Sequence, residues 1–285
     1  MIACMSYSIL ISSFVSCVKS TELFSAQNFY LKKMLVFPNA KINIGLYVTE
    51  RRADGFHNLE TVFYPVPLQD ILEMVPATTE DLFVSGIAVP GIKEENLVWK
   101  AYQLIRAAYP EKTQQLHIYL HKLIPMGAGL GGGSADASFV LTAMNNLFDL
   151  KIDVATLMAY ALQLGSDCPF FIENTPQFAS GRGEVFTPMA LDLSAYEFKF
   201  IHPGIHVATA HAFSNIKVGP AAFDLRTLAA LPIDQWKNRI ENVFEEAVFA
   251  MHPAIAEAKQ ALYDQGALYA SMSGSGSSVY GIFEK

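Results

Sequence analysis

Five glycines lie within the seven residues from Gly127 to Gly133, directly before a helical pattern. Glycine lets the backbone bend with its N–H groups exposed, and the first turn of a helix has about four N–H groups without intrahelical partners. The helix dipole adds partial positive charge at the same place. This combination predicts a loop that binds a polyphosphate.

No Lys-Ser or Lys-Thr pair follows the last glycine, so the loop is not a P-loop of the Walker A type. Gly127, Gly129 and Gly132 fit the G-x-G-x-x-G pattern, which keeps a dinucleotide-binding oxidoreductase as an alternative.

Asp167 is a second candidate for chemistry, because it follows Gly165 and precedes Cys168-Pro169. The glycine is expected to end a helix and the proline to prevent its continuation, so the carboxylate can project from a loop. The residues alone favour a catalytic base and a solvated turn equally.

Three histidines, His202, His206 and His211, lie close together in the sequence and suggest a metal site. However, Pro203-Gly204 prevents a helix that would align the first two, so no metal site is predicted.

Alternating strands and helices must position these residues. Hydrophobic periodicity predicts strands over 35–49, 61–75, 116–120 and 279–283, and helices over 96–108, from about Ser134, over 154–164 and over 253–263. Residues 51–58 form a predicted polar turn centred on Asp54-Gly55. A shift in composition at residues 180–183 marks the expected domain boundary.

Composition limits the class of protein. The chain has 285 residues, of which 52% are hydrophobic and 16% are charged, as in globular proteins. A net charge of −7 without a basic cluster argues against nucleic acid or an anionic membrane as partner. Three cysteines, two of them in the first twenty residues, exclude a disulfide framework and fit a reducing cytosol. Residues 1–33 have no basic residue before Lys19, unlike a signal peptide, and we expect them to lie outside a fold that begins at Met34.

Residues 125–134, Pro-Met-Gly-Ala-Gly-Leu-Gly-Gly-Gly-Ser, resemble the ATP-binding motif of the GHMP kinases, the superfamily of galactokinase, homoserine kinase and mevalonate kinase. Residues 38–43 resemble the N-terminal motif of that superfamily, and residues 273–278 its third glycine motif. Residues 52–57, Arg-Ala-Asp-Gly-Phe-His, and residues 165–171 resemble the members that phosphorylate a cytidine diphosphate derivative of methylerythritol. The resemblance covers residues 34–285.

The resemblance implies a two-domain α+β fold with the active site in the cleft between the domains. The N-terminal domain, 34–179, would be similar to domain 2 of ribosomal protein S5, and the C-terminal domain, 180–285, would be ferredoxin-like. It also implies a cytoplasmic enzyme that uses ATP and Mg²⁺ to phosphorylate the 2-hydroxyl of the substrate on the route to isoprenoid precursors. Another GHMP kinase is the second possibility, although a substrate without a nucleobase would have no use for Phe56 and His57.

The resemblance also assigns roles to residues. Asp167 would be the catalytic base and Lys41 its partner. ATP would bind at Pro125, Met126, Gly127, Ala128, Gly129, Leu130, Gly131, Gly132, Gly133, Ser134 and Ala135. The substrate would bind at Asn43, Phe56, His57, Phe213, Gly274 and Ser275. The chain departs from the family pattern at Ala135 (commonly Ser), at Phe56 (commonly Tyr) and at Val243, where Asp is expected within the segment 242–245.

Overall fold

The computed structural model describes residues 33–208, 212–213 and 216–285. The expectation for residues 1–33 therefore falls, apart from Lys33, outside the described residues. The described strands form three sheets, with orders β1-β4-β6-β5, β2-β3-β7-β8 and β10-β11-β9. All strand pairs in them are antiparallel except β5 with β6.

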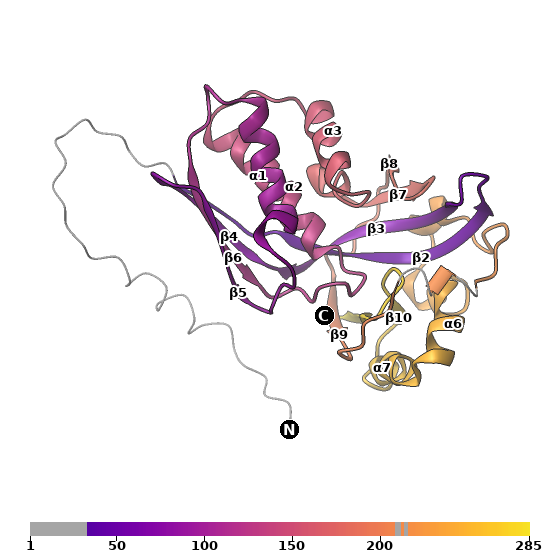
Figure 1. The fold of residues 1–285 in the computed structure, drawn as a ribbon. Coiled ribbons are helices and arrows are strands. Elements are labelled where there is room, and N and C mark those ends of the chain that lie inside the picture. Colours follow the sequence, from indigo (N-terminus) through magenta and orange to yellow (C-terminus); the bar gives the residue numbers. More distant parts are fainter. Residues whose placement is uncertain (1–32, 209–211, 214–215) are drawn as a thin grey trace. The chain divides into compact units, whose positions relative to one another are not determined.

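The first sheet consists of β1 (Met34–Val36), β4 (Ile71–Pro76), β6 (Leu116–Lys122) and β5 (Asp81–Gly86). Helices α1 (Leu97–Ala108), α2 (Gly132–Leu147) and α3 (Val154–Leu164) lie on one side of it (Figure 1). Asn96 and Asp153 start α1 and α3, because each side chain accepts a hydrogen bond from a backbone N–H of the first turn. The apolar faces of the helices pack on the sheet in a core that includes Leu72, Ile118, Tyr102, Val140 and Leu157. This layer fixes the end of β6 and the start of α2, between which the glycines lie.

The second sheet contains the two longest strands, β2 (Asn39–Arg51) and β3 (His57–Gln69), followed by β7 (Gln177–Ser180) and β8 (Val185–Pro188). The side chains of the first ten residues of β2 are buried, so this strand runs through the interior. The turn between β2 and β3 is closed by Arg52, whose guanidinium donates to both carboxylate oxygens of Asp54. The 3₁₀ helix η1 (Lys93–Glu95) precedes α1, and the short helix α4 (Phe170–Glu173) precedes β7.

The third sheet is formed by β10 (Tyr269–Met272), β11 (Val279–Glu284) and β9 (Tyr196–Ile201). Helices α6 (Phe244–Met251) and α7 (Pro253–Asp264) share a core with it that includes Phe244, Ile255, Leu262, Met272 and Val279. The 3₁₀ helices η2 (Leu225–Ala230) and η3 (Ile233–Asn238) supply Leu225, Leu228 and Trp236 to a further core with residues of β2 and β11. Strand β2 therefore packs against elements from the opposite end of the chain.

The expected helices are confirmed, although α2 begins at Gly132 rather than near Ser134. Two expected strands are wrong in their extent. Residues 35–49 form two strands, β1 and β2, because Pro38 has no N–H group to continue a ladder. Residues 61–75 are likewise divided, at Asp70, whose buried carboxylate turns toward a lysine. The expected domain boundary at 180–183 falls on the turn between β7 and β8, and stays a prediction.

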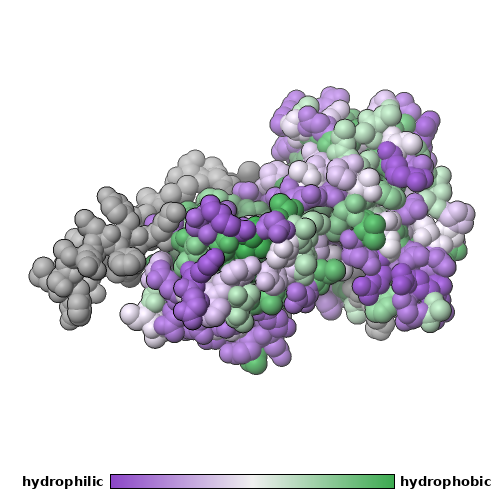
Figure 2. Space-filling model, turned by 90° about the horizontal axis from the view of Figure 1, so that it is seen from above, coloured by the Kyte–Doolittle hydropathy of each residue, from purple (hydrophilic) through white to green (hydrophobic). Residues whose placement is uncertain are grey.

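The surface is largely hydrophilic on the face drawn in Figure 2, with hydrophobic side chains in small patches between polar ones. The large apolar side chains that stay exposed include Leu35, Phe37 and Phe83 in or beside the first sheet. Within the described residues, no helix has the length and apolar character needed to cross a membrane.

Candidate active site

The glycine loop, residues 125–133, connects β6 to α2 and passes very close to other backbone. Gly129 has a φ of +79°, and a Cβ atom on it would lie 1.9 Å from the carbonyl oxygen of Ser273. Gly131 has a φ of +70°, and a Cβ atom there would lie 3.0 Å from the ring of Phe171 and 3.1 Å from the side chain of Lys41. Glycine is thus required at both positions by the backbone conformation and, at Gly129, also by space.

Helix α2 begins at the end of this loop, with Gly131 as its N-cap residue in a left-handed conformation. The N–H groups of the first turn have no partners within the helix, and the dipole places partial positive charge there. Glycine at 131, 132 and 133 leaves this backbone without side chains that would keep an anion away. The loop and the helix start therefore offer the donors that a polyphosphate needs.

Lys41 and Asp167 meet beside the loop, although 126 positions separate them in the sequence (167 − 41). Lys41 Nζ lies 3.5 Å from Asp167 Oδ2, and the side chains are 4% and 34% exposed. The backbone N–H of Lys41 also donates to the carbonyl of Leu130 at 2.9 Å, which attaches β2 to the glycine loop. The structure thus brings a half-exposed carboxylate, a buried ammonium and the glycine loop together.

The surroundings of Lys41 hold its ammonium in place. Nζ donates to Asn43 Oδ1 at 2.6 Å and lies 4.5 Å from the centre of the Phe63 ring. Burial lowers the pKa of Lys41 below the usual lysine range, and the Asp167 carboxylate partly counteracts this. Such a lysine can stabilise developing negative charge at short range, because little water screens it.

A turn formed by residues 273–278, called here the serine–glycine turn, closes the other side of the glycine loop. Ser273 Oγ donates to the carbonyl of Gly129 at 2.7 Å and accepts from the N–H of Asn43 at 3.2 Å. The N–H of Ser278 donates to the carbonyl of Ala128 at 3.1 Å. A Cβ atom on Gly274 would lie 3.4 Å from Asn43 Oδ1, so this predicted residue is also at the site, next to Ser275.

His57 and Phe213, two of the residues expected to hold a nucleobase, are stacked with ring centroids 4.9 Å apart. Phe213 in turn packs edge-on against Phe244 at 4.8 Å. Phe56 is 53% exposed, and the guanidinium of Arg182 lies 5.0 Å from its ring centre. Among the described residues, no ring contact joins Phe56 to His57 or Phe213. The structure therefore brings two of the three aromatic residues together.

A buried ionic cluster beneath the glycine loop was not anticipated from the sequence. Lys122, at the end of β6, forms ion pairs with Asp70 and with Asp136 of α2, the latter at 2.7 Å. Asp70 Oδ1 also accepts from the N–H groups of Leu123 and Ile124, at 2.5 and 2.9 Å. The cluster thereby joins the two ends of the loop. Asp136 lies two residues after the glycine motif, but nothing in its neighbours indicated its buried partners.

Asp136 carries an unusual charge balance in this cluster. Its Oδ1 atom is buried and has no hydrogen-bond partner in the part of the chain that the structure describes. Burial raises the pKa of Asp136 to about 7, the ammonium of Lys122 opposes this and the carboxylate of Asp70 adds to it. With a proton on Asp136, the three groups carry no net charge.

No group of three or more His, Cys, Asp or Glu side chains among the described residues is arranged to hold a metal ion. Cys168, beside Asp167, is buried, and burial raises the pKa of its thiol to about 11. It is therefore a packing residue and not a nucleophile.

Comparisons with known proteins agree on one superfamily. Residues 96–174 match the family model for the GHMP kinases N terminal domain, and residues 224–285 match that for the GHMP kinases C terminal domain. A 4-diphosphocytidyl-2-C-methyl-D-erythritol kinase of Azobacteroides pseudotrichonymphae is 52% identical over 253 residues, 88% of this chain and 94% of the relative. The protein of the same name from Bacteroides thetaiotaomicron is 48% identical over 255 residues, 88% of this chain and 92% of the relative.

Solved structures lead to the same family. A crystal structure of 4-(cytidine 5'-diphospho)-2C-methyl-D-erythritol kinase has a TM-score of 0.73 and 33% identity, and the match covers 87% of this chain and 90% of that one. The Methanococcus jannaschii mevalonate kinase has a TM-score of 0.64 but only 10% identity, with 89% and 91% of the two chains covered. This second likeness shows a shared fold alone.

Proposed function

The chain belongs to the 4-diphosphocytidyl-2-C-methyl-D-erythritol kinases of the GHMP kinase family, with their two-domain α+β fold, and we propose that it phosphorylates the 2-hydroxyl of that substrate with ATP. The product belongs to the methylerythritol phosphate route to isoprenoid precursors, and we place the reaction in the cytoplasm. The observation that carries the proposal within the structure is the Lys41–Asp167 pair beside the glycine loop.

Asp167 is the proposed catalytic base. The substrate hydroxyl oxygen forms a bond to the terminal phosphorus, the bond from that phosphorus to the bridging oxygen breaks, and ADP leaves. The hydroxyl proton passes to the carboxylate of Asp167, which is exposed enough to meet the substrate. Lys41 stabilises the negative charge that spreads over the reacting oxygens. Positioning and charge stabilisation supply most of the catalysis in phosphoryl transfer, so a weak base suffices.

The glycine loop, from Pro125 through Met126 and Leu130 to Gly133, is proposed to hold the ATP phosphates together with Ser134 and Ala135 of the first turn of α2. Mg²⁺ would arrive with ATP. It prefers oxygen ligands and is usually bound by one or two carboxylates together with substrate phosphates. Among the described residues no group of side chains is arranged to hold such an ion by itself, so the ATP phosphates would supply most of its ligands, and the ion would neutralise their charge when bound.

The cytidine part of the substrate is proposed to lie beside the His57–Phe213 stack. A ring nitrogen of His57, held by Phe213, can hydrogen-bond to the base edge, and an aromatic face such as that of Phe56 can stack on the base. Phe56 precedes His57 on the turn between β2 and β3, and would cover the base from there. Asn43, Gly274 and Ser275 are proposed to bind the rest of the substrate beside the glycine loop, since a Cβ atom on Gly274 would lie 3.3 Å from Gly129 Cα.

A coupled assay of ADP formation tests the function. The purified protein should form one ADP per molecule of 4-diphosphocytidyl-2-C-methyl-D-erythritol and show no comparable turnover with mevalonate or homoserine. Those controls separate this family from other GHMP kinases of the same fold. Turnover with mevalonate or homoserine, or none with the cytidylated substrate, would contradict the assignment.

A further inference from the structure

The segment 241–245 comprises the end of the connection from η3 to α6 and the first two residues of α6, and it is attached to β2. The N–H of Leu46 donates to the carbonyl of Glu241 at 2.8 Å, and the N–H of Val243 donates to the carbonyl of Leu46 at 2.9 Å. Val243 uses only its backbone in this pairing, and its side chain packs against hydrophobic cores. The pairing therefore needs no polar side chain at position 243, where Asp was expected. The polar contacts of the segment come from its other residues.

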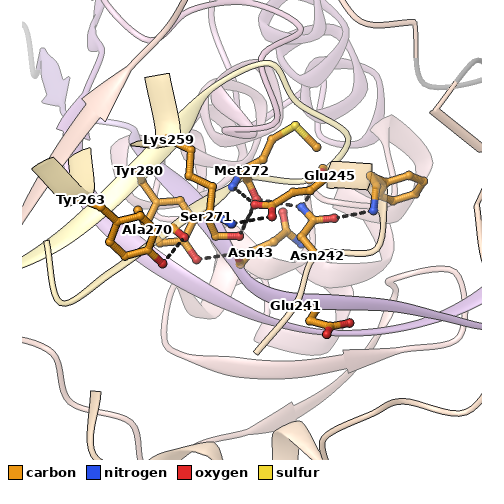
Figure 3. A network of polar contacts seen from close by, with 12 residues as sticks. Asn43, Glu241, Asn242, Glu245, Lys259, Tyr263, Ala270, Ser271, Met272 and Tyr280 are labelled. Atoms are coloured by element: carbon orange, nitrogen blue, oxygen red, sulfur yellow. Dashed lines mark hydrogen bonds and ion pairs between the residues drawn. The ribbon is translucent and has the colours of Figure 1, made fainter. Parts of the chain in front are cut away.

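The side chain of Asn242 is 3% exposed and reaches the start of the serine–glycine turn (Figure 3). Its amide nitrogen donates to the carbonyls of Met272 and Gly274, both at 2.8 Å. Its oxygen accepts from the N–H of Phe244 at 3.0 Å, at the start of α6. All three hydrogen bonds are to backbone, so Asn242 fixes the position of the turn relative to the helix.

Glu245 holds the same point of the chain from the other side. Its Oε1 accepts from the N–H of Met272 at 2.8 Å and from Ser271 Oγ at 3.0 Å (Figure 3). Its Oε2 accepts from Lys259 Nζ at 2.5 Å. The carbonyl and the N–H of Met272 are thus bound by two side chains that lie three positions apart in the sequence (245 − 242).

This arrangement sets directions within the serine–glycine turn as well as its position. A peptide unit is planar, with its C=O and N–H on opposite sides. When Asn242 fixes the carbonyl of Gly274, it also directs the N–H of Ser275 to the side away from Asn242. Ser273, which precedes Gly274, binds the carbonyl of Gly129 in the glycine loop and the N–H of Asn43. The turn therefore transmits its position to both proposed binding elements.

We propose that Asn242 and Glu245 are positioning residues of the kinase, which hold the serine–glycine turn against the glycine loop and Asn43. This inference rests on the proposed function, in which those two elements bind ATP and the substrate. Neither residue is proposed to touch the reacting atoms. A displaced turn would misalign the reacting groups, and a misplacement of about 1 Å can cost on the order of 100-fold in rate.

Asn242→Ala tests the proposal, with Asn145→Ala as the matched control. Asn145 also binds backbone with its amide, since it donates to the carbonyl of Ile152 at 3.0 Å and accepts from its N–H at 2.9 Å. It lies near the far end of α2, roughly 20 Å along the helix from Gly132. Asn242→Ala should lower kcat on the order of 10- to 100-fold. Asn145→Ala should destabilise the protein, but its kcat, measured at a temperature at which the variant is folded, should equal that of the wild type.

Glu245→Ala and Glu245→Gln form a second pair, which decides the matter if Asn242→Ala does not fold. Gln keeps an oxygen acceptor for the N–H of Met272 and Ala does not, so only Glu245→Ala should lose kcat strongly. Hydrogen exchange of residues 273–278, measured on the protein without ligands, should be faster in Asn242→Ala than in Asn145→Ala. Wild-type kcat in both Asn242→Ala and Glu245→Ala, with hydrogen exchange of residues 273–278 unchanged, would overturn the inference. An inactive wild-type protein with faster exchange in Asn242→Ala would instead overturn the proposed function.

Discussion

Lys41 is a buried cation, and the side chain of its acidic neighbour Asp167 is about one-third exposed. Burial lowers its pKa, and the charge is kept by Asp167, by the Asn43 oxygen and by the ring of Phe63. Water is largely excluded around the lysine, so electrostatic interactions of its ammonium are strengthened. The aspartate, in contrast, stays accessible to solvent and substrate. The division suits a reaction in which a hydroxyl must approach the carboxylate while the lysine stays fixed.

Asp167→Asn should abolish most turnover and preserve ATP binding. The amide cannot accept the hydroxyl proton as a carboxylate does, and loss of a general base typically lowers kcat by about 10²- to 10⁴-fold. The glycine loop, which is proposed to bind ATP, does not depend on this carboxylate. Steady-state kinetics and calorimetric titration of ATP would check both parts. Asp264→Asn, at the end of α7 where it accepts from Gln260, is a control that should behave as wild type.

At the scale of elements, the glycine loop is held at its ends by the cluster of Lys122, Asp70 and Asp136, and in its middle by the serine–glycine turn and by β2. The close-packed loop before α2 was predictable, because glycine spacing before a helix has a direct physical meaning, and its role in phosphate binding stays a prediction. The cluster was not predictable. Its members are separated by 52 and 14 positions, and a buried charge in a single sequence looks like an exposed one.

Gly129→Ala should destabilise the protein and weaken ATP binding. The left-handed backbone costs a non-glycine residue about 1–2 kcal/mol. In addition, the new Cβ would overlap the carbonyl oxygen of Ser273, so the two turns must separate. Gly133→Ala is the matched control for stability, because a Cβ there would have its nearest contacts at 3.8 and 3.9 Å. Urea denaturation should show the control as stable as the wild type, or about 1 kcal/mol more stable. Equal losses in the two variants would contradict this account of the loop.

The cluster also predicts a pH dependence of stability. Because the pKa of Asp136 is raised to about 7, the folded protein keeps a proton that the unfolded chain releases near pH 4. Its contribution to the free energy of unfolding is therefore complete below about pH 4 and is lost as the pH rises to 7, by up to about 1.4 kcal/mol per pH unit. In Asp136→Asn this loss disappears. The free energy of unfolding of the wild type minus that of the variant should therefore fall from pH 5 to 7 and stay constant above pH 7. A constant difference in urea denaturation from pH 5 to 8 would contradict the raised pKa.

At the scale of the whole molecule, strand β2 connects the glycine loop to the C-terminal part of the chain. Leu46 is bound by the segment 241–245, Asn43 by Ser273 and Tyr280, and Lys41 by Leu130. The order of the motifs in the sequence indicates that they belong to one family, but not which atoms meet. The stack of His57 on Phe213 joins residues 156 positions apart (213 − 57), and only the fold brings them together.

His57→Ala tests this long-range pairing. A base edge that loses a buried hydrogen-bond partner costs about 1–3 kcal/mol, which corresponds to a roughly 5- to 150-fold higher KM for the cytidylated substrate. The KM for ATP should not change, because the glycine loop is a separate element. His117→Ala, on β6 where the ring contacts Thr79 and Phe83, is the control. A rise in the KM for ATP instead would assign the stack to adenine.

The close approach of Gly129 to Ser273 has a further consequence for nucleotide binding. The glycine loop is ordered when the chain folds, by contacts with residues that are more than 140 positions away. A loop that is already ordered has less conformational entropy to lose when phosphates bind. Part of the affinity for ATP is thus determined by hydrogen bonds that never touch the nucleotide. Substitutions in the serine–glycine turn can therefore weaken ATP binding by loosening the unliganded protein.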